Sequence, residues 1–374
     1  MGDIAVGLVP APELPEKMAK RLAEILPELL VDQIDASLEW EIDVIIDPLT
    51  GAAETADEII EETEIRKQKN KWDYAICLTD LPIYENGNIV LADINKSRGV
   101  SQISLPAFGS VPMKKRLQEV VLETISELHY YHYNTSQEHQ RKKKLPKLFS
   151  PIRKIVPEDE EDSLRYIVIP KINGRLRVLM GMVYANRPWT IFPSFKSVVA
   201  VAFATGTYGL IFPTLWQLSA AFQSIRFIGL MLTALSSMII WIILAHNLWE
   251  KPSHRSKYNL RRVYNLVTVI TLSLAVLLYY TMLLILFFLA VRVFVPAELF
   301  AAEAGLEGKA GMIDYIKLSW LATSVATLAG AIGAGLENDE LVRNITYGYR
   351  QKRRYKEIQN DSSDHEEARE TQDA

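Results

Sequence analysis

The stretch YNLVTVITLSLAVLLYYTMLLILFFLAVRVFV, residues 264–295, decides the fold of the C-terminal half of the chain. Its one charged residue is Arg292, which lies near the end of the stretch, where a long side chain can reach the membrane surface. An α-helix needs about 20 apolar residues to cross the hydrocarbon of a bilayer. This stretch is longer than that, so we expect a tilted membrane-spanning helix.

Three more apolar stretches of sufficient length lie at residues 195–218, 225–248 and 313–336. A soluble protein would have to bury four such helices in succession. The sequence therefore predicts an all-α four-helix transmembrane bundle within residues 191–340. None of the four stretches has an acidic residue near its middle, and such residues are typical of pumps and proton relays.

Basic residues near the ends of the apolar stretches predict the orientation, because such residues stay on the cytosolic side. They follow the second stretch as Lys251, Arg255, Lys257, Arg261 and Arg262, and the fourth as Arg343, Arg350, Lys352, Arg353 and Arg354. The loop 296–312 is acidic, so we expect it outside. The N-terminal residues MGDIAVGLVP lack the features of a secretory signal. We therefore expect a multi-pass protein of the cell membrane with both termini cytosolic.

Small residues form one face of the fourth stretch. They are Ala326, Gly330, Gly333 and Ala334. Small residues at helical spacing let helices approach closely. This face is expected to pack within the bundle or to pair two copies of the chain in a homo-oligomer. A pore-lining role is the alternative.

The N-terminal third alternates between strand-like and helix-like segments. The predicted strands are 3–9, 39–46, 72–78, 88–94 and 100–105, and the predicted helices are 13–33, 52–70 and 111–134. This order predicts a three-layer α/β domain over residues 1–135, which we expect in the cytosol. Cys77 is the one cysteine and lies in an apolar run, so we expect a buried thiol and no disulfide.

A linker that is first basic and then acidic follows over residues 136–162. Its cations are Arg141, Lys142, Lys143, Lys144, Lys147, Arg153 and Lys154. They suit anionic lipid head groups, and a solvated linker is the alternative. Nucleic acid is disfavoured because no aromatic side chains accompany the charges. Residues 163–190 read as a juxtamembrane β-hairpin turning at Asn173-Gly174. Residues 341–374 read as a polar cytosolic tail.

Polar residues follow two of the predicted strands, where α/β folds commonly bind ligands. They are Thr79, Asp80, Asp93, Lys96, Ser97 and Arg98. Their carboxylates, hydroxyls and cations predict a site for a small polar ligand or a metal. The structural alternative is that Asp80 caps a turn before Leu81-Pro82.

The histidines of SELHYYHYNTSQEH form a second candidate site. His129, His132 and His139 share roughly one helical face if the helix extends that far, and histidines so spaced can bind zinc or copper. The alternative is that they complement the dipole at a helix end.

The segments WDYAICLTDLP, ISLPAFG, GRLRVLMGMVYANRPW and AGAIGAGLENDELVRNITYGYRQ resemble an uncharacterised group of bacterial multi-pass membrane proteins. The resemblance spans most of the chain. It implies an N-terminal α/β domain followed by four transmembrane helices, and it implies no activity.

The sequence lacks the glycine-rich phosphate loops, zinc-protease motif and nucleophile elbow of common enzymes. Whether the chain binds a cofactor is unknown from the sequence. The absence of these motifs favours a non-enzymatic, membrane-tethered module that binds a ligand or partner. One alternative is a small transporter or channel with a regulatory cytosolic domain. Another is a membrane-anchored enzyme with a site near Asp80 and Asp93.

Overall fold

The computed structural model describes residues 3–48, 56–85, 88–110, 112–133, 152–157, 162–169, 171–190, 195–250, 258–334, 342–344, 346, 349–350 and 353–354. The chain divides into two compact units. Unit 1 combines Met1–Ala185 with Arg350–Ala374, and unit 2 is Asn186–Tyr349. Unit 1 thus joins the N-terminal half to a segment of the polar tail.

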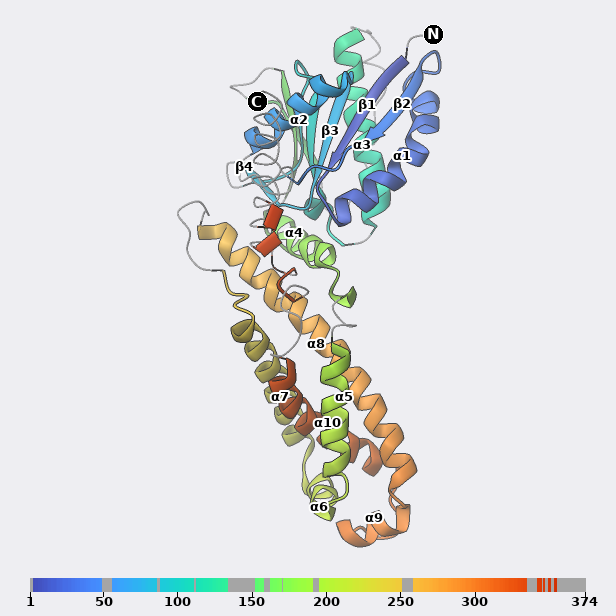
Figure 1. Ribbon diagram of the computed structural model, residues 1–374, viewed down its shortest axis with the longest axis vertical. Coiled ribbons are helices and arrows are strands. Elements are labelled where there is room, and N and C mark those ends of the chain that lie inside the picture. Colours follow the sequence, from blue (N-terminus) through green and yellow to red (C-terminus); the bar gives the residue numbers. More distant parts are fainter. Residues whose placement is uncertain are drawn as a thin grey trace, which may run out of the picture. The chain divides into compact units, whose positions relative to one another are not determined.

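The described part of unit 1 contains a mixed sheet of eight strands (Figure 1). The strands are β1 Asp3–Pro10, β2 Glu39–Val44, β3 Tyr74–Thr79, β4 Ile83–Glu85, β5 Asn88–Asn95, β6 Val100–Ser104, β7 Ile152–Ile155 and β8 Ser163–Val168. Their order is β2-β1-β3-β6-β5-β8-β7, and β4 pairs with β5. The five strands predicted from the sequence are confirmed. The central strands β3 and β6 are buried along their whole length, as strands covered on both faces are.

Three helices cover the two faces of this sheet: α1 Leu14–Gln33, α2 Ala56–Asn70 and α3 Met113–Tyr133. Successive residues of a strand point to opposite faces. On β3, the buried thiol of Cys77 packs with Ile59 of α2, whereas Tyr74 points to His129 of α3. α2 therefore lies on one face, and α1 and α3 lie together on the other (Figure 1).

β5 runs antiparallel to each strand that it pairs with, and this makes the sheet mixed. β1, β2, β3 and β6 are parallel, but β5 runs antiparallel to β6, with Asn95 opposite Val100. Only residues 96–99 connect the two strands. A parallel crossover needs a dozen or more residues, so the short connection forces a hairpin.

The β-hairpin expected over residues 163–190 is wrong. Residues Ser163–Val168 form β8, but Lys171–Asn186 form the helix α4, and Asn173-Gly174 lies inside it. A Cβ atom on Gly174 would lie 3.1 Å from Ile89 Cδ1, so this glycine permits close packing and does not form a turn. β8 pairs instead with β5 and with β7, which lies in the segment expected to be a linker.

The first expected span, residues 195–218, is broken in unit 2. α5 (Lys196–Gly209) and α6 (Pro213–Ala221) meet at an angle of 91°, as in a broken span or a re-entrant loop. Pro213 begins α6, where the missing proline N–H breaks no helical hydrogen bond. The Trp216 indole N–H donates to the Leu210 carbonyl at 2.9 Å and satisfies a backbone group at the break.

Two described helices, Ser224–Ala245 (α7) and the part Leu260–Phe294 of α8 (Tyr258–Phe294), are long and apolar enough to cross a membrane. The bent pair α5–α6 makes three if it is one span. Large apolar side chains cover their outer surfaces, including Ile225 at 70% and Val293 at 77% exposure. Apolar surface on this scale is typical of proteins that contact lipid or a partner.

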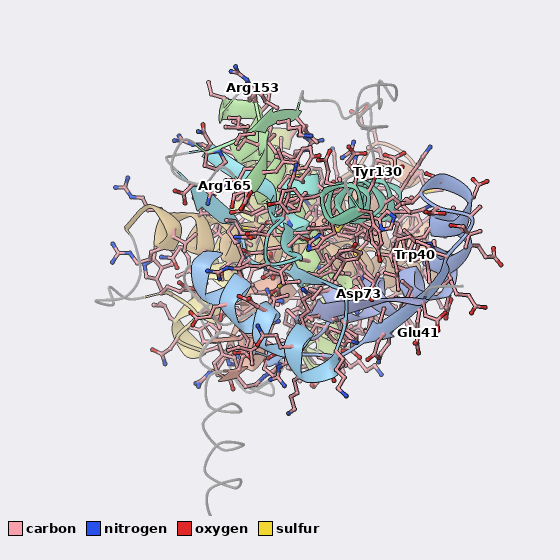
Figure 2. The ribbon with its side chains drawn as sticks, turned by 90° about the horizontal axis from the view of Figure 1, so that it is seen from above. Trp40, Glu41, Asp73, Tyr130, Arg153 and Arg165 are labelled. Carbon is pink, nitrogen blue, oxygen red and sulfur yellow. The ribbon has the colours of Figure 1, made fainter. Side chains whose placement is uncertain are left out.

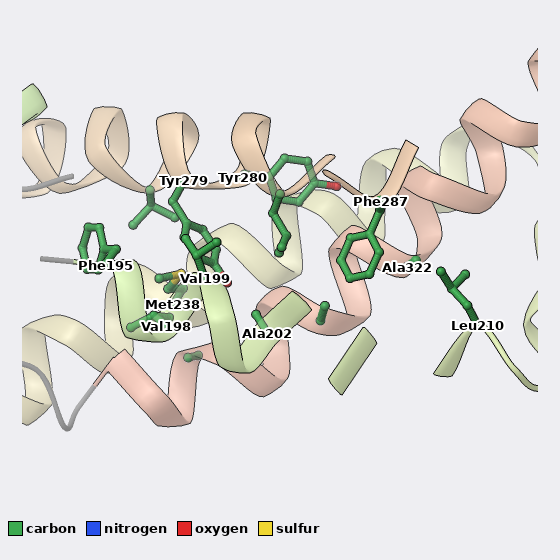
Figure 3. Packing of buried hydrophobic residues seen from close by; sticks show 14 of the residues in the cluster. Phe195, Val198, Val199, Ala202, Leu210, Met238, Tyr279, Tyr280, Phe287 and Ala322 are labelled. Carbon is green, nitrogen blue, oxygen red and sulfur yellow. The ribbon is translucent and has the colours of Figure 1, made fainter. Parts of the chain in front are cut away.

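α10 (Met312–Ala334), the fourth expected span, is a helix but is not among those apolar enough to cross a membrane, so the count of four is unconfirmed. α10 packs against α5, α7 and α8, so much of its surface contacts protein. A Cβ atom on Gly330 would lie 2.7 Å from Tyr279 Oη and 3.1 Å from Ala202 Cβ. Ala326 and Gly330 of the small face thus pack within the chain, beside the apolar cluster of Figure 3.

The loop 296–312 contains α9 (Ala297–Ala304), which packs against α6. Gly305 ends α9 in the left-handed conformation, as glycine commonly does at a helix C-terminus. Exposed Lys309 and Glu298 form an ion pair of 2.9 Å across this loop.

Candidate functional site

The carboxyl edge of the parallel strands carries acidic residues after three neighbouring strands. Glu13 follows β1, Asp47 follows β2 and Asp80 follows β3. Asp47 accepts a hydrogen bond from Arg66 Nε at 2.8 Å, so it is engaged with α2. The other two carboxylates bind arginines from the C-terminal segment.

Asp80 forms a bidentate ion pair with Arg354. Arg354 Nη1 donates to Asp80 Oδ1 at 2.9 Å, and Nη2 donates to Oδ2 at 3.2 Å. Arg350 Nη1 lies 3.3 Å from the same Oδ2. The Asp80 and Arg354 side chains are 1% and 0% exposed, and they are separated by 274 positions in the sequence. This is a fully desolvated tertiary ion pair with the planar geometry that favours arginine over lysine.

Burial by itself raises the pKa of Asp80, but the charges of Arg354 and Arg350 outweigh it. The net pKa of Asp80 therefore lies below the ordinary value. A carboxylate held ionised by two guanidinium groups is a counter-charge rather than a proton acceptor.

Glu13 binds the same C-terminal segment from the neighbouring strand. Arg350 Nη1 donates to Glu13 Oε2 at 3.0 Å, and Arg353 Nη2 donates to Oε1 at 3.1 Å. Glu13 has a backbone φ of 78°, which costs a non-glycine residue roughly 1–3 kcal/mol. We call Glu13, Asp80, Arg350, Arg353 and Arg354 the arginine–carboxylate cluster.

The turn that presents Asp80 is fixed by hydroxyl groups. Thr79 Oγ1 accepts from the Leu81 N–H at 3.1 Å, and Ser104 Oγ donates to the Leu81 carbonyl at 2.8 Å. Thr79 and Asp80 therefore do lie together at one edge of the sheet, as the sequence predicts, but Thr79 supports the turn.

The other predicted ligand residues do not join them. Because β5 is antiparallel to β6, residues 96–98 lie at the amino end of the parallel strands. That end is roughly 13 Å from Thr79 along β3, at about 3.3 Å per residue. Asp93 accepts from Arg165 Nε at 2.8 Å in the interior of the sheet. The single site made of all six residues is therefore wrong.

The three remaining residues at the amino end have partners of their own. Lys96 pairs with Glu127 at 3.3 Å, and Arg98 pairs with Glu64 at 3.3 Å. Ser97 Oγ donates to Asn95 Oδ1 at 3.0 Å within the turn. The two ion pairs connect α3 and α2 to the β5–β6 hairpin.

The histidines of α3 pack among aromatic rings. His129 is buried, with its ring centroid 5.3 Å from that of Trp40 and 4.6 Å from that of Tyr133. His132 Nδ1 lies 3.0 Å from the Leu128 carbonyl of its own helix. Figure 2 shows Trp40 and Tyr130 in this part of unit 1. Among the described residues no group of three potential ligands is placed to hold a metal, and His139 lies outside them.

Two of the predicted membrane-surface cations fall on β7. Lys154 Nζ donates to Glu127 Oε1 at 2.8 Å, so Lys154 is a partner of α3. Arg153 projects outward from the sheet (Figure 2). Arg141, Lys142, Lys143, Lys144 and Lys147 lie outside the described residues.

Sequence reasoning missed Glu13 and the role of the C-terminal arginines. Glu13 follows β1 in the same way as Asp80 follows β3. This similar position after a strand was the signal that could have identified Glu13 as a site residue. By its composition, the run QKRRYK (351–356) indicates only which side of the membrane the segment occupies.

Comparisons with known protein families, with curated proteins and with solved structures find no significant match to this chain. The resemblance to a group of bacterial membrane proteins therefore stays a prediction.

Proposed function

We propose that this chain is a membrane-tethered binding module whose sheet edge binds a basic, arginine-bearing peptide segment. One observation carries the proposal: buried Asp80 accepts hydrogen bonds from both guanidinium nitrogens of Arg354 and pairs with Arg350. In this structure the carboxylates are occupied by the chain's own Arg350, Arg353 and Arg354. A partner with the same arginine spacing would compete with these arginines for Asp80 and Glu13.

The geometry supports binding more than catalysis. Both oxygens of Asp80 already accept guanidinium N–H groups, whereas a general base needs a free acceptor near the proton it removes. Asp93, the second carboxylate of the enzyme hypothesis, pairs with Arg165 inside the sheet. The two acids therefore give little support to an enzyme that uses both.

Two buried hydroxyl groups of α10, those of Ser319 and Thr323, give the transporter alternative no support. Ser319 Oγ donates to the Tyr315 carbonyl and Thr323 Oγ1 to the Ser319 carbonyl, both at 2.7 Å. These buried hydroxyls are satisfied by their own helix and need no solute. Flux of solutes through proteoliposomes containing the chain would favour the transporter instead.

The tether in this proposal is the apolar part of unit 2, in the cell membrane. The α/β unit and both termini would be cytosolic, because the basic residues after α7 and after α10 would be retained there. The basic residues 141–147 would meet anionic lipid head groups. Homo-oligomers would need another surface, since Ala326 and Gly330 are already packed within the chain.

Peptide competition tests the binding site. The full chain is purified in detergent with Arg350→Ala and Arg354→Ala, so that its own segment cannot fill the edge. A fluorescent peptide TYGYRQKRRYKEI (346–358) is titrated into it by anisotropy. We expect saturable binding to this double variant, and weaker apparent binding to the wild-type chain, in which the segment competes.

The control is a triple variant that adds Asp80→Asn to the double variant. In this triple variant no buried charge of the Asp80–Arg350–Arg354 group is left unpaired. Binding should fall at least tenfold, and a peptide with lysine at all three arginine positions should bind more weakly than the arginine peptide. Equal binding with and without Asp80 would contradict the proposal.

A further inference from the structure

Two arginines of unit 1 meet at one backbone carbonyl beside the short 3-10 helix η2 (Leu105–Phe108). Arg116 Nη1, from the first turn of α3, donates to the Phe108 carbonyl at 2.6 Å. Arg177 Nε, from α4, donates to the same oxygen at 3.3 Å. Two positively charged guanidinium groups therefore share one neutral acceptor, the Phe108 carbonyl oxygen.

In the described part of the chain, no carboxylate forms an ion pair with either arginine. Among the described residues neither Arg116 nor Arg177 has an acidic partner within 4.0 Å. Arg177 Nη2 is buried and has no hydrogen-bond partner. Glu119 favours the charged form of Arg116 from a greater distance but forms no ion pair with it. Buried charges in folded proteins are ordinarily paired with an opposite charge. The two arginines therefore lack the anionic partner that such groups usually have.

The position of Arg177 is fixed by close packing. A Cβ atom on Gly181 of α4 would lie 2.2 Å from the Pro106 carbonyl oxygen, so the helix contacts η2 directly. Gly109 has a φ of +78°, and a Cβ atom there would lie 3.0 Å from Arg177 Cγ. The two glycines thus allow Arg177 to reach the Phe108 carbonyl.

The surroundings add positive charge. Lys114 and Lys115 are exposed in the first turn of α3, which has no acidic residue. Acidic residues are normally favoured there by the helix dipole. Burial first, and then the charge of Arg116, lower the pKa of Arg177 to about 10, as expected for a cation without a counter-charge.

We propose that Arg116 and Arg177 form a binding site for a phosphate group. Phosphate is the anion best matched to two planar guanidinium groups, because it accepts several N–H bonds at once and carries up to two charges. Arg116 is buried and Arg177 is half-buried, so a phosphate group would approach the pair from the side of Arg177. The phosphate belongs to a phospholipid head group or to a soluble compound, and this site does not depend on the arginine–carboxylate cluster.

The test uses the full chain in a non-ionic detergent and three probes: inorganic phosphate, dioctanoyl phosphatidic acid and dioctanoyl phosphatidylcholine. Dissociation constants come from the shift of the thermal unfolding midpoint with probe concentration. We expect saturable stabilisation by inorganic phosphate if the ligand is soluble. Stabilisation by phosphatidic acid alone would assign the site to a lipid head group.

The variant Arg177→Gln should weaken the bound probe at least tenfold, whereas Arg175→Gln, on the exposed side of the same helix, should change it less than twofold. The second measurement needs no variant: the probe should protect Arg177 of the wild-type chain from phenylglyoxal, mapped by mass spectrometry. The proposal is overturned if no probe stabilises the chain beyond chloride at matched ionic strength. Binding that Arg177→Gln leaves unchanged, without protection of Arg177, also overturns it.

Discussion

Asp80 shows how one residue can determine the placement of a distant segment. Its carboxylate, 1% exposed, neutralises Arg354 and contributes to neutralising Arg350. A buried ion pair adds little stability compared with apolar residues of the same shape, but breaking it leaves an unpaired charge. Removing the charge of Asp80 is therefore expected to cost more stability than the ion pair itself contributes.

Asp80→Asn should destabilise unit 1 by about 3–5 kcal/mol, because two buried guanidinium groups lose a counter-charge. The measurement is thermal unfolding of the detergent-solubilised chain, and Asp43→Asn, on the edge strand β2, serves as the control. Adding Arg350→Leu and Arg354→Leu to Asp80→Asn should recover much of the loss. Unfolding of Asp80→Asn at the wild-type midpoint would show that the pair is not formed.

His129 should make unit 1 less stable in mild acid. Burial lowers the pKa of His129 and the charge of His132 lowers it further, whereas Asp35 opposes them, and the net pKa lies below the ordinary value of 6.5. The unfolded chain therefore takes up a proton at a higher pH than the folded chain does. The stability that unit 1 gains from keeping His129 neutral is therefore fully present above about pH 6.5, and it decreases as the pH falls below that value.

The measurement is the unfolding midpoint between pH 7.5 and 5.5. Asp35 stays ionised in this range because its pKa is lowered further by hydrogen bonds from Ser37 and by His129. His129→Phe keeps a ring against Trp40 and Tyr133 and should lose this part of the pH dependence. His132→Phe should retain it. The same slope in the wild type and in His129→Phe would assign the effect to other groups.

At the scale of elements, small residues set the distances between the helices of unit 2. A Cβ atom on Gly206 of α5 would lie 2.2 Å from Phe287 Cζ of α8 and 2.9 Å from Ala326 Cβ of α10. Figure 3 shows Phe287 within this apolar cluster. A side chain at position 206 must displace the Phe287 ring or one of the two helices.

Gly206→Ala should therefore destabilise unit 2 by about 1–3 kcal/mol, as overpacking does. Gly229 of α7 has no atom within 4 Å of an added Cβ, so Gly229→Ala should be neutral or slightly stabilising. Size-exclusion chromatography after heating in detergent measures the fraction that stays folded. Equal survival of the two variants would mean that α5 and α8 do not approach closely at this position.

For the whole molecule, the decisive question is which side of a membrane each segment occupies. The bent α5–α6 pair and the less apolar α10 make the number of crossings a matter for measurement. An odd number of crossings would separate the termini, whereas our proposal places both in the cytosol.

Labelling by a membrane-impermeant maleimide in intact cells tests this topology. Cys77, the one native cysteine, is buried and is replaced by alanine. Single cysteines are then placed at the exposed positions Glu303 of α9, Arg153 of β7 and Glu28 of α1. Labelling of position 303 alone, with positions 28 and 153 labelled only after lysis, is expected. Labelling of position 28 in intact cells would reverse the proposed orientation.

The sequence by itself determined the division into a charged α/β half and an apolar helical half, and the positions of five strands. Those features follow from hydrophobic periodicity, which is a local property of the chain. It also predicted that Cys77 is buried, because an apolar run in a central strand leaves it no exposed position.

Only the tertiary structure decided what Asp80 contacts, which way β5 runs and where the first apolar stretch bends. Asp80 meets Arg354 across 274 positions, and no local pattern encodes a pairing at that separation. A helical segment such as Lys171–Asn186 resembles a strand pair until its packing partner is known, because Asn-Gly suits a turn and glycine also suits close helix packing. Periodicity determines elements, whereas charge pairing and close contact between elements determine the site.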